Sequence, residues 1–400
     1  MSAAIPIPAS EVDAICRHPL KIAERLAADF AQTAIERDRK GGTAKRERDL
    51  LRESGLLNLL IPEALGGGGA DWPEILRIVR LFARVDSSLA HLFGFQHLLL
   101  ATVDLFGSEE QRARHFEETA RNRWFWGNAL NPLDQNTHAT PADGRWLVNG
   151  RKGFCSGATD SDRLLLSALD PEGRLLVGVI PSDRAGLRIR QDWDNFGQRQ
   201  TDSGTVEFSN VALHDEEILR SPGPLGSVRA TLRPCLAQII LANIYLGIAE
   251  GALAEARNYT LAQTRSWLTS GVETPTEDPY ILANYGNMFV ELQAARTLTD
   301  RAADTLQRTW EMGEGLSENC RGRAAIDIAV AKTLTTRTAL DVTNRMFEVM
   351  GSRATAGAAR LDRFWRNVRT HTLHDPVDYK IRELGDWALN RHIPKPTFYS

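Results

Sequence analysis

The sequence is poor in cysteine, and the few thiols that it has are scattered. Its 400 residues include only Cys16, Cys155, Cys235 and Cys320, with no Cys-x-x-Cys spacing among them. This excludes a zinc motif of that type, and no metal site is expected. Dispersed thiols in a chain of this length favour a reducing compartment, so we expect a cytoplasmic protein. Residues 1–8 lack a basic segment and a long apolar stretch, and we therefore expect no secretory signal.

Neither strong net charge nor a long hydrophobic run is present. Lys and Arg number 48 and Asp and Glu 51, which gives a formal net charge of −3. Such a balance argues against non-specific binding to nucleic acid or to an anionic membrane. The most apolar run, 239–248, is interrupted by polar residues and falls short of the ~20 apolar residues that cross a bilayer. We expect neither a nucleic acid nor a membrane as partner.

A dinucleotide-binding fingerprint is also missing. The glycine run at 66–69 does not follow an expected strand, so it lacks the strand-turn-helix context of that motif. Tight binding of a nicotinamide cofactor to this chain is therefore not expected. No internal repeat or low-complexity tract is visible either.

What is present is an ordinary globular composition, with 42% hydrophobic and 25% charged residues. The length fits two or three packed units, at roughly 100–200 residues per domain. Helical patterns occupy the first part of the chain. Asp71 is an expected N-cap ahead of Pro73, and Ser108 with Gln111 resembles a capping box. The expected helices cover 19–34, 44–57, 73–84 and 86–106.

The middle of the chain changes character. Short apolar runs alternate with turn pairs such as Asp143-Gly144 and Asn149-Gly150, which predicts an antiparallel sheet or a small barrel without a helix of useful length. The last part is helical again, and its nearly all-round apolar segment predicts a buried helix in an up-down bundle. We therefore expect a mostly α chain with a central β-domain. The expected domains are an N-terminal helical domain at 1–122, a β-domain at 123–222, and a C-terminal helical bundle and tail at 223–400.

Several strings give this order a family resemblance over nearly the whole chain. The chain resembles the acyl-CoA dehydrogenase superfamily, which implies that fold, with a β-barrel-like middle domain and a C-terminal four-helix bundle. The strings that carry this resemblance are Ile61–Gly67, Gly150–Ala158, Gly247–Leu253 and Phe347–Gly351.

A closer resemblance lies within that superfamily. Longer strings are similar to the flavin-dependent sulfur monooxygenases, a group that includes the dibenzothiophene and methanesulfinate enzymes. These strings are Asp71–Pro73, His91–Gly94, Phe154–Ala158, Arg199–Gly204, Phe364–His371 and Leu373–Val377. They occur in the same order along the chain, which makes the resemblance far more specific than a lone glycine motif.

One departure supports the subgroup. Where the short-chain type of dehydrogenase carries its proton-abstracting Glu-Gly, this chain reads His374-Asp375-Pro376. The missing glutamate weakens a dehydrogenase assignment, although Asp375 keeps a carboxylate there.

The resemblance implies a flavin site around Phe154, Ser156 and Asn128. A strand that ends in small residues lets a planar ring approach the backbone, Ser156 can hydrogen-bond the polar edge of a flavin, and Phe154 can cover its face. Asn128 would lie near the reactive edge, where an amide can donate to an oxygen of flavin or substrate. The alternatives are a tight bend in a β-domain and an asparagine that serves a turn.

Two arginines are implied to hold the flavin phosphate, one of them across a subunit interface. These are Arg265 and Arg353, whose guanidinium fork suits two phosphate oxygens at once. The alternative is a solvated arginine at a helix end. That alternative applies more strongly to Arg360, Arg363, Arg366 and Arg369, some of which we expect to pair with carboxylates.

Three histidines are candidates for acid–base work. His91 and His374 come first and His371 second, because imidazole can hydrogen-bond or protonate an oxygen species near neutral pH. The alternative for each is a satisfied histidine of the core.

The substrate pocket is expected to include Phe95, Trp193 and Arg199. Trp193 would form an apolar wall that excludes water. Arg199 would bind an anionic sulfinate, or else pair with a local carboxylate. The dibenzothiophene enzyme has tyrosine at the place of Phe95, so the lost hydroxyl argues against identical substrate use.

Together these features predict a two-component monooxygenase. FMNH2 would come from a separate NAD(P)H-dependent FMN reductase, and dioxygen would react through a flavin C4a-(hydro)peroxide. The expected substrate is a small organosulfur compound, foremost an alkanesulfinate such as methanesulfinate. Dibenzothiophene or another sulfide or sulfone is the first alternative, and an FAD-dependent acyl-CoA dehydrogenase is a further one. An amine or phenol hydroxylase and a flavin-binding scaffold without chemistry also stay open. The resemblance implies a homotetramer.

Overall fold

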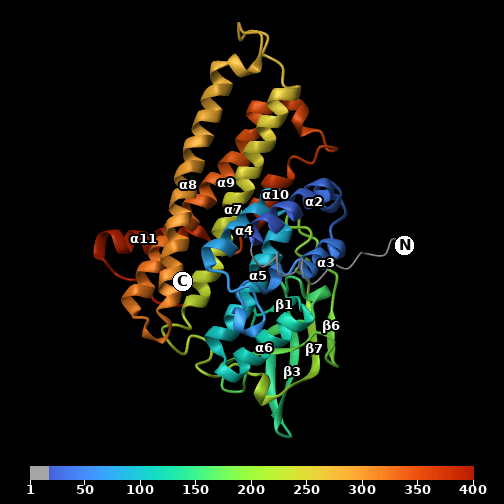
Figure 1. The fold of residues 1–400 in the computed structure, drawn as a ribbon, viewed down its shortest axis with the longest axis vertical. Coiled ribbons are helices and arrows are strands. Elements are labelled where there is room, and N and C mark those ends of the chain that lie inside the picture. Colours follow the sequence, from blue (N-terminus) through green and yellow to red (C-terminus); the bar gives the residue numbers. More distant parts are fainter. Residues whose placement is uncertain (1–17) are drawn as a thin grey trace.

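The computed structural model describes residues 18–400, and Cys16 lies outside this range. Its long axis runs from the β-domain at the lower end, through the N-terminal helices, to the tip of a bundle of long helices (Figure 1). This order confirms the expected acyl-CoA dehydrogenase fold. Short 3-10 turns connect the elements at Leu56–Asn58, Glu63–Leu65, Ala158–Asp160, Asp215–Glu217, Pro275–Glu277, Gly313–Gly315 and Ser352–Thr355.

The N-terminal helices begin where local capping predicts. The side chain of Asp71 accepts a hydrogen bond from the amide of Glu74, and Ser108 and Gln111 form the expected capping box. Asp86 caps the next helix by accepting from Ser88 and Leu89. The helices are α2 (Pro19–Lys40), α3 (Lys45–Glu53), α4 (Trp72–Ala83), α5 (Ser87–Phe106) and α6 (Glu109–Asn122).

The middle of the chain folds into one seven-stranded sheet with the order β1-β4-β2-β3-β7-β6, and β5 pairs with β4. The expectation was an antiparallel sheet or a small barrel, and four of the strand pairs are antiparallel, but β4 pairs in parallel with both β1 and β2. Parallel neighbours are not visible in turn signals, since the connections between them are longer than a hairpin. The strands are β1 (Trp126–Ala129), β2 (Thr137–Ala142), β3 (Arg145–Lys152), β4 (Arg163–Leu169), β5 (Leu175–Pro181), β6 (Leu187–Ile189) and β7 (Val206–Leu213).

The C-terminal helices form the bundle. The helix α7 packs against α9, α8 packs on both, and α11 packs on α9. Their bounds are α7 (Leu232–Gln263), α8 (Pro279–Glu311), α9 (Glu318–Met350), α10 (Arg363–His371) and α11 (Val377–Asn390). Helices α5 and α7 are long and apolar enough to cross a membrane, but 94% of the apolar window of each is buried inside the protein. This burial is typical of core helices, and it accounts for their apolar sequences.

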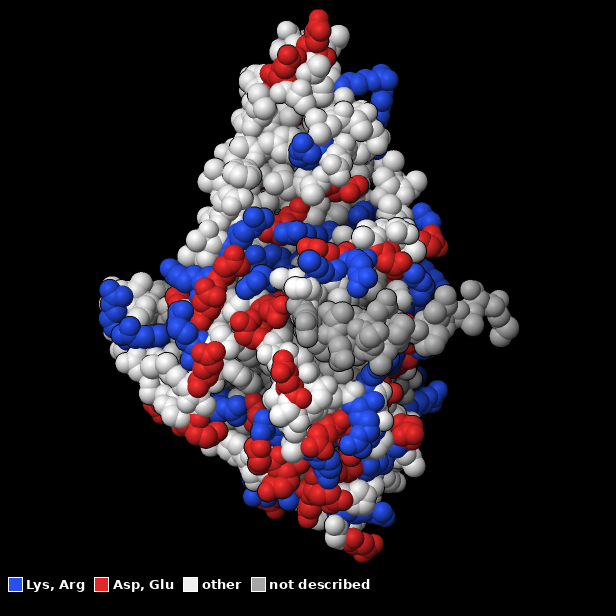
Figure 2. Space-filling view, viewed as in Figure 1, with Lys and Arg blue, Asp and Glu red and all other residues white. Residues whose placement is uncertain are grey.

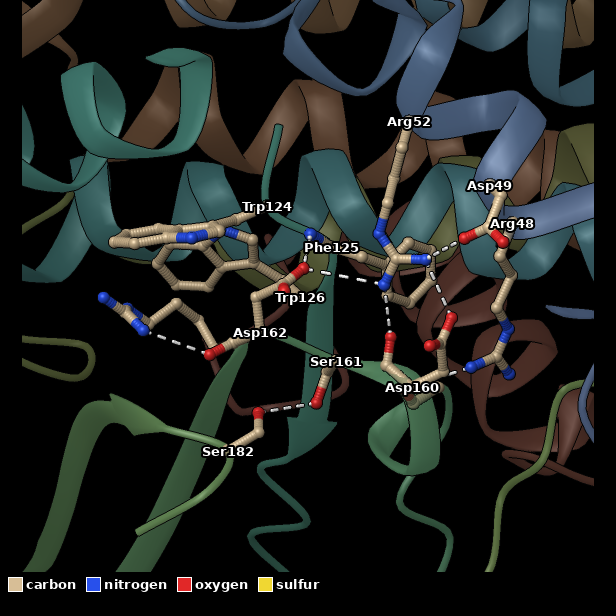
Figure 3. A network of polar contacts seen from close by, with 12 residues as sticks. Arg48, Asp49, Arg52, Trp124, Phe125, Trp126, Asp160, Ser161, Asp162 and Ser182 are labelled. Atoms are coloured by element: carbon tan, nitrogen blue, oxygen red, sulfur yellow. Dashed lines mark hydrogen bonds and ion pairs between the residues drawn. The ribbon is translucent and has the colours of Figure 1, made fainter. Parts of the chain in front are cut away.

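A polar network joins α3 to the β-domain (Figure 3). Arg52 reaches down from α3 and binds both the carboxylate of Asp160, at 2.8 Å, and its backbone carbonyl, at 2.6 Å. Asp162 accepts from the amide of Phe125 at 2.7 Å, just before β1. The network fixes the turn that follows Gly157, and with it the segment 154–158.

Candidate functional site

A cavity of about 460 Å³ lies where the three parts of the chain meet. Its wall combines aromatic and aliphatic side chains with amides, hydroxyls and imidazoles. Helices α5 and α10, strand β1, the segment 154–156, the loop 193–203 and the end of the chain all contribute to it. Most of the residues singled out from the sequence meet here, namely His91, Phe95, Asn128, Phe154, Ser156, Trp193, His371 and His374.

Phe154 provides an open aromatic surface in this cavity. The residue is 65% exposed, and its backbone has φ +58°, a left-handed conformation that is costly for a bulky residue. The ring of Trp193 lies edge-on to it at 5.9 Å between centroids. An exposed ring held at such cost fits a site for a planar ligand, and the isoalloxazine ring of a flavin has this shape.

Asn128 lies on β1 with its side chain at the cavity wall. The Oδ1 atom accepts a hydrogen bond from the amide of Leu130 at 3.1 Å, which identifies the carbonyl end of the side chain. The NH₂ end has no acceptor among the described residues. It is therefore available to donate to a flavin edge or a substrate oxygen, as expected from the sequence.

His91, Ser156 and His371 are hydrogen-bonded to one another. The Nε2 atom of His91 lies 3.0 Å from the hydroxyl of Ser156, and its Nδ1 atom lies 3.1 Å from Nε2 of His371. Phe95, one turn along α5, stacks on the His91 ring at 3.9 Å between centroids. Burial lowers the pKa of His91 to about 3 and holds the pKa of His371 well below its usual value. Both imidazoles are thus neutral at physiological pH.

His374 has a different environment. Its side chain is 38% exposed, and its Nδ1 atom lies 3.2 Å from the carboxylate of Asp375. Behind it, Lys332 donates to Asp375 at 3.0 Å and to Gln238 at 2.7 Å. Burial alone would raise the pKa of the Asp375 carboxyl, but the hydrogen bond from His374 and the charge of Lys332 hold it well below its usual range. Asp375 is consequently a weak base, which argues against the proton abstraction of a dehydrogenase.

Arg199 does not line the cavity, contrary to the expectation of a sulfinate-binding arginine. Its Nε atom donates to the backbone carbonyl of Asp38 at 2.7 Å, and its Nη1 atom lies 3.5 Å from the carbonyl of Asn195. The alternative expected from the sequence, pairing with a local carboxylate, is not observed either, since both partners are backbone carbonyls. The carbonyl at the end of α2 turns this guanidinium toward the N-terminal domain.

Arg265 and Arg353 are exposed at the far end of the bundle. They follow α7 and α9, whose ends are joined by a hydrogen bond from Thr264 to the carbonyl of Met350 at 3.2 Å. Among the described residues that line the cavity there is no lysine or arginine. Within one chain, therefore, these two arginines are not brought to the cavity. Arg360 and Arg366, in contrast, both bind the carboxylate of Asp38, as the pairing alternative predicts.

The structure adds residues that sequence reasoning missed. The C-terminal tail returns to the cavity and places Tyr399 beside His374, with 6.0 Å between ring centroids. Thr201 and Ser203 lie in a string that carried the family resemblance, but no role for them was foreseen. No strand periodicity marks them, because Asp202 between them has a left-handed backbone with φ +51°. The other additions are Leu130, Asn131, Leu133, Asn195, Phe196, Gln198, Thr370 and Leu373.

Comparisons with known proteins agree with this geometry. Family models match residues 21–123 (acyl-CoA dehydrogenase, N-terminal domain), 127–211 (acyl-CoA dehydrogenase, middle domain) and 239–379 (acyl-CoA dehydrogenase, C-terminal domain). The probable FMNH2-dependent monooxygenase SfnC of Pseudomonas putida is 53% identical over 96% of this chain and 98% of its own length.

Two solved structures are similar over almost the whole chain. Methanesulfinate monooxygenase MsuC from Pseudomonas fluorescens is 54% identical, with a TM-score of 0.95 over 96% of this chain and 99% of its own. FMN-bound TdsC, a dibenzothiophene monooxygenase from Paenibacillus sp. A11-2, is 45% identical, with a TM-score of 0.91 over 95% and 99%. The chain therefore belongs to the acyl-CoA dehydrogenase family, and within it to the FMNH2-dependent monooxygenases of the sulfur-oxygenating type.

Proposed function

We propose that this FMNH2-dependent monooxygenase oxidises a small alkanesulfinate, methanesulfinate foremost, to the sulfonate. In the overall reaction one atom of dioxygen forms a new S–O bond and the other leaves as water. FMNH2 supplies the two electrons and two protons and is released as FMN. The substrate loses the lone pair on sulfur and gains one oxygen.

The observation that carries this choice is the pairing of an apolar wall with hydrogen-bond donors that have no acceptor among residues 18–400. The NH₂ group of Asn128 is one such donor. The phenol of Tyr399 is a second, because burial raises its pKa and keeps it protonated. A sulfinate has two oxygens to accept these bonds and a small alkyl group for the apolar wall. Dibenzothiophene offers no oxygen acceptor.

The cofactor is FMN, and reduced FMN supplies the activation of dioxygen when it is bound. The protein orients and encloses the reactants. Phe154 and Trp193 provide surfaces for a planar ring and for exclusion of water. The neutral imidazoles of His91 and His371 add no charge to the cavity, which leaves His374 as the histidine open to the solvent side.

Similarity supports the same choice, since identity to the methanesulfinate enzyme is 54% and to the dibenzothiophene enzyme 45%. The second relationship makes oxygenation of a thiophene, sulfide or sulfone the second candidate. Phe95, stacked on His91, adds to the apolar wall that would face the small alkyl group.

The test is product analysis with FMNH2 generated continuously by an NADH-dependent FMN reductase. The panel is methanesulfinate, longer alkanesulfinates, dimethyl sulfone, dimethyl sulfide and dibenzothiophene, and ion chromatography quantifies sulfonate. With ¹⁸O₂, methanesulfonate should gain one heavy oxygen. A higher kcat/KM for dibenzothiophene than for every sulfinate would contradict the proposal.

We further propose that the protein is a homotetramer in which Arg265 and Arg353 of a neighbouring subunit hold the FMN phosphate. The absence of a cation from the described cavity wall supports this, because a phosphate needs one. The helix α8 also exposes large apolar side chains, including Leu282, Phe289 and Val290, at 54%, 56% and 66%. At the upper end of the molecule, which α7, α8 and α9 form, few charged residues are visible on the face seen in Figure 2. Such a surface is typical of an interface between subunits.

A further inference from the structure

A continuous chain of hydrogen bonds runs along the cavity wall from α10 to the loop 198–203. Its links measure 3.1, 3.0, 2.8, 2.8 and 2.9 Å. The members, in order, are His371, His91, Ser156, Ser203, Thr201 and the backbone carbonyl of Gln198.

The direction of the hydroxyl links follows from the last member. A carbonyl oxygen only accepts, so the hydroxyl of Thr201 donates to Gln198. A hydroxyl has one proton, and Thr201 must therefore accept from Ser203. Ser203 has then also used its proton, so it accepts from Ser156. Every hydroxyl proton in the chain consequently points toward Gln198.

The same reasoning fixes both imidazoles. Because Ser156 donates its only hydroxyl proton to Ser203, it accepts from Nε2–H of His91. His91 is neutral, so its Nδ1 atom has only a lone pair and accepts from Nε2–H of His371. His371, also neutral, is left with an Nδ1 lone pair that has no partner among the described residues.

The acceptor at the end of the chain is itself held in place. The carbonyl of Gln198 also accepts from Trp193 Nε1 at 2.8 Å, and the amide of Gln198 donates to Asn367 Oδ1 at 2.8 Å. Asn367 lies one turn before His371 on α10. Both ends of the chain are therefore tied to one helix, α10, which holds the carbonyl of Gln198 and the ring of His371 in fixed positions.

We infer that Thr201 and Ser203 are positioning residues that fix His91 and His371 as Nε2–H tautomers. Ser156, which lines the cavity, then keeps a spare lone pair as an acceptor there, whereas the Nδ1 lone pair of His371 is buried without a partner among the described residues. Such an acceptor matches a ligand with N–H donors, and this use rests on the proposed function, since reduced flavin is such a ligand. The chain does not carry a proton away, because a backbone carbonyl takes up no proton at neutral pH.

The first test uses flavin-free protein and measures tautomers directly. Solid-state ¹⁵N NMR of protein labelled at histidine separates protonated from unprotonated ring nitrogens. Difference spectra against His91→Gln and His371→Gln assign the two rings. We expect both rings as Nε2–H in the native protein at pH 7. An Nδ1–H or doubly protonated ring at either position would overturn the inference.

Variants test what fixes the tautomer. In Ser203→Ala, Ser156 loses its acceptor and becomes free to donate to Nε2 of His91, so both rings should change to Nδ1–H. Thr201→Val removes the next link and should act in the same direction, whereas Thr201→Ser keeps the hydroxyl and the native tautomers. The matched control is Ser182→Ala, which breaks the other serine pair of the β-domain, Ser161 with Ser182 at 2.7 Å. Unchanged tautomers in both Ser203→Ala and Thr201→Val would overturn the proposal.

Turnover gives a second readout. One neutral hydrogen bond is worth roughly 0.5–1.5 kcal/mol, so Ser203→Ala should lower kcat about two- to tenfold with KM for substrate little changed. Thr201→Ser should keep native turnover. Predicted tautomers in a protein that oxidises no organosulfur compound would contradict the proposed function and leave the tautomer assignment standing. If the native protein oxidised methanesulfinate but both rings were Nδ1–H, the tautomer assignment would be contradicted and the proposed function would stand.

Discussion

The histidines of the cavity differ in the partners that surround them, and the partners determine what each can do. His91 and His371 are buried and neutral, and they hydrogen-bond one another. His374 lies at the cavity with Nδ1 directed to a carboxylate, which leaves Nε2 free for a ligand. Only His374 thus combines access to the cavity with a fixed acidic neighbour.

His374→Ala should therefore retain FMN binding but lose oxygen transfer. General acid–base groups contribute ~10²–10⁴-fold, so product should fall at least a hundredfold while hydrogen peroxide accumulates. Asp375→Asn should do less harm, since it keeps a hydrogen-bonding neighbour for the imidazole. Paired assays of sulfonate and peroxide at equal FMNH2 measure both effects.

A surface pair provides the control for this experiment. His392 lies 3.2 Å from Asp386 and is 70% exposed, so His392→Ala removes an equivalent pair away from the cavity. It should leave product and peroxide unchanged. If His374→Ala formed sulfonate at the native level without releasing hydrogen peroxide, His374 would have no part in the mechanism. A greater loss of product in Asp375→Asn than in His374→Ala would favour a carboxylate base.

Lys332 is expected to matter for folding rather than for contact with ligand. It is buried to 1% exposure and holds the buried carboxylate of Asp375. Lys332→Met leaves that charge without its cation and should lower the free energy of unfolding by about 3–5 kcal/mol. The double variant Lys332→Met with Asp375→Asn should recover part of the loss. Denaturation of flavin-free protein measures it, with exposed Lys45→Met as the control expected to cost less than about 1 kcal/mol.

The loss of unfolding free energy in Lys332→Met should depend on pH, because the pKa of Asp375 is lowered in the folded protein. A carboxyl whose pKa is depressed in the folded state contributes stability above its unfolded pKa, about 3.9, and this is lost as pH falls through the folded pKa. Lys332→Met weakens the depression. The difference in stability between native protein and variant should therefore be largest near pH 7 and shrink below pH ~4. A constant difference over this range would contradict the role of Lys332.

At the scale of helices and strands, local signals determined what could be predicted. Capping residues such as Asp71 and Ser108 fixed helix starts correctly, because a cap bonds amides within one turn. Strand β2 has no continuous apolar run and β6 has only three residues, so neither was foreseen. The parallel pairing of β4 depends on contacts distant in sequence.

For the site, too, the sequence could not reveal contacts between residues that are distant along the chain. His91 and Ser156 were found through strings that resemble a family, Asn128 through what that resemblance implies, and all three line one cavity. Arg199 was misplaced because a backbone carbonyl of α2, which no motif marks, binds it. Tyr399 was missed because the tail reaches the cavity only through the folding of the whole C-terminal part.

The arginines that follow α7 and α9 should contribute to flavin binding. Arg265→Ala and Arg353→Ala should each weaken FMNH2 binding about ten- to a hundredfold, since a charge-assisted hydrogen bond is worth roughly 1.5–3 kcal/mol. The effect on turnover at saturating FMNH2 should be smaller. Anaerobic fluorescence titration measures the affinity. The control is Arg308→Ala, an exposed arginine near the other end of α8, and an equal loss there would contradict a phosphate role.

For the whole molecule, the position of these arginines links flavin binding to assembly. Both follow the ends of α7 and α9 at the upper end of the bundle (Figure 1). The cavity, in contrast, is lined by residues of α5, α10 and the β-domain and has no cation among its described lining residues. A phosphate bound at the cavity of one subunit then depends on the bundle of another. The exposed apolar side chains of α8 are spaced for such packing, since Leu282 and Phe289 are two turns apart on one face.

Disrupting the α8 surface should therefore remove flavin binding without touching the cavity. Phe289→Asp combined with Val290→Lys places charges in a surface that the tetramer would bury, and an unpaired buried charge strongly opposes association. Sedimentation should show the mass fall from about four times 44.4 kDa toward that of one chain. FMNH2 affinity should fall with it, because the arginines of the neighbouring subunit are withdrawn. Arg188→Glu on the edge strand β6 is the control and should change neither property. Dissociated chains that bind FMNH2 as tightly as the native protein would place the phosphate contacts within one subunit and exclude Arg265 and Arg353 from the site.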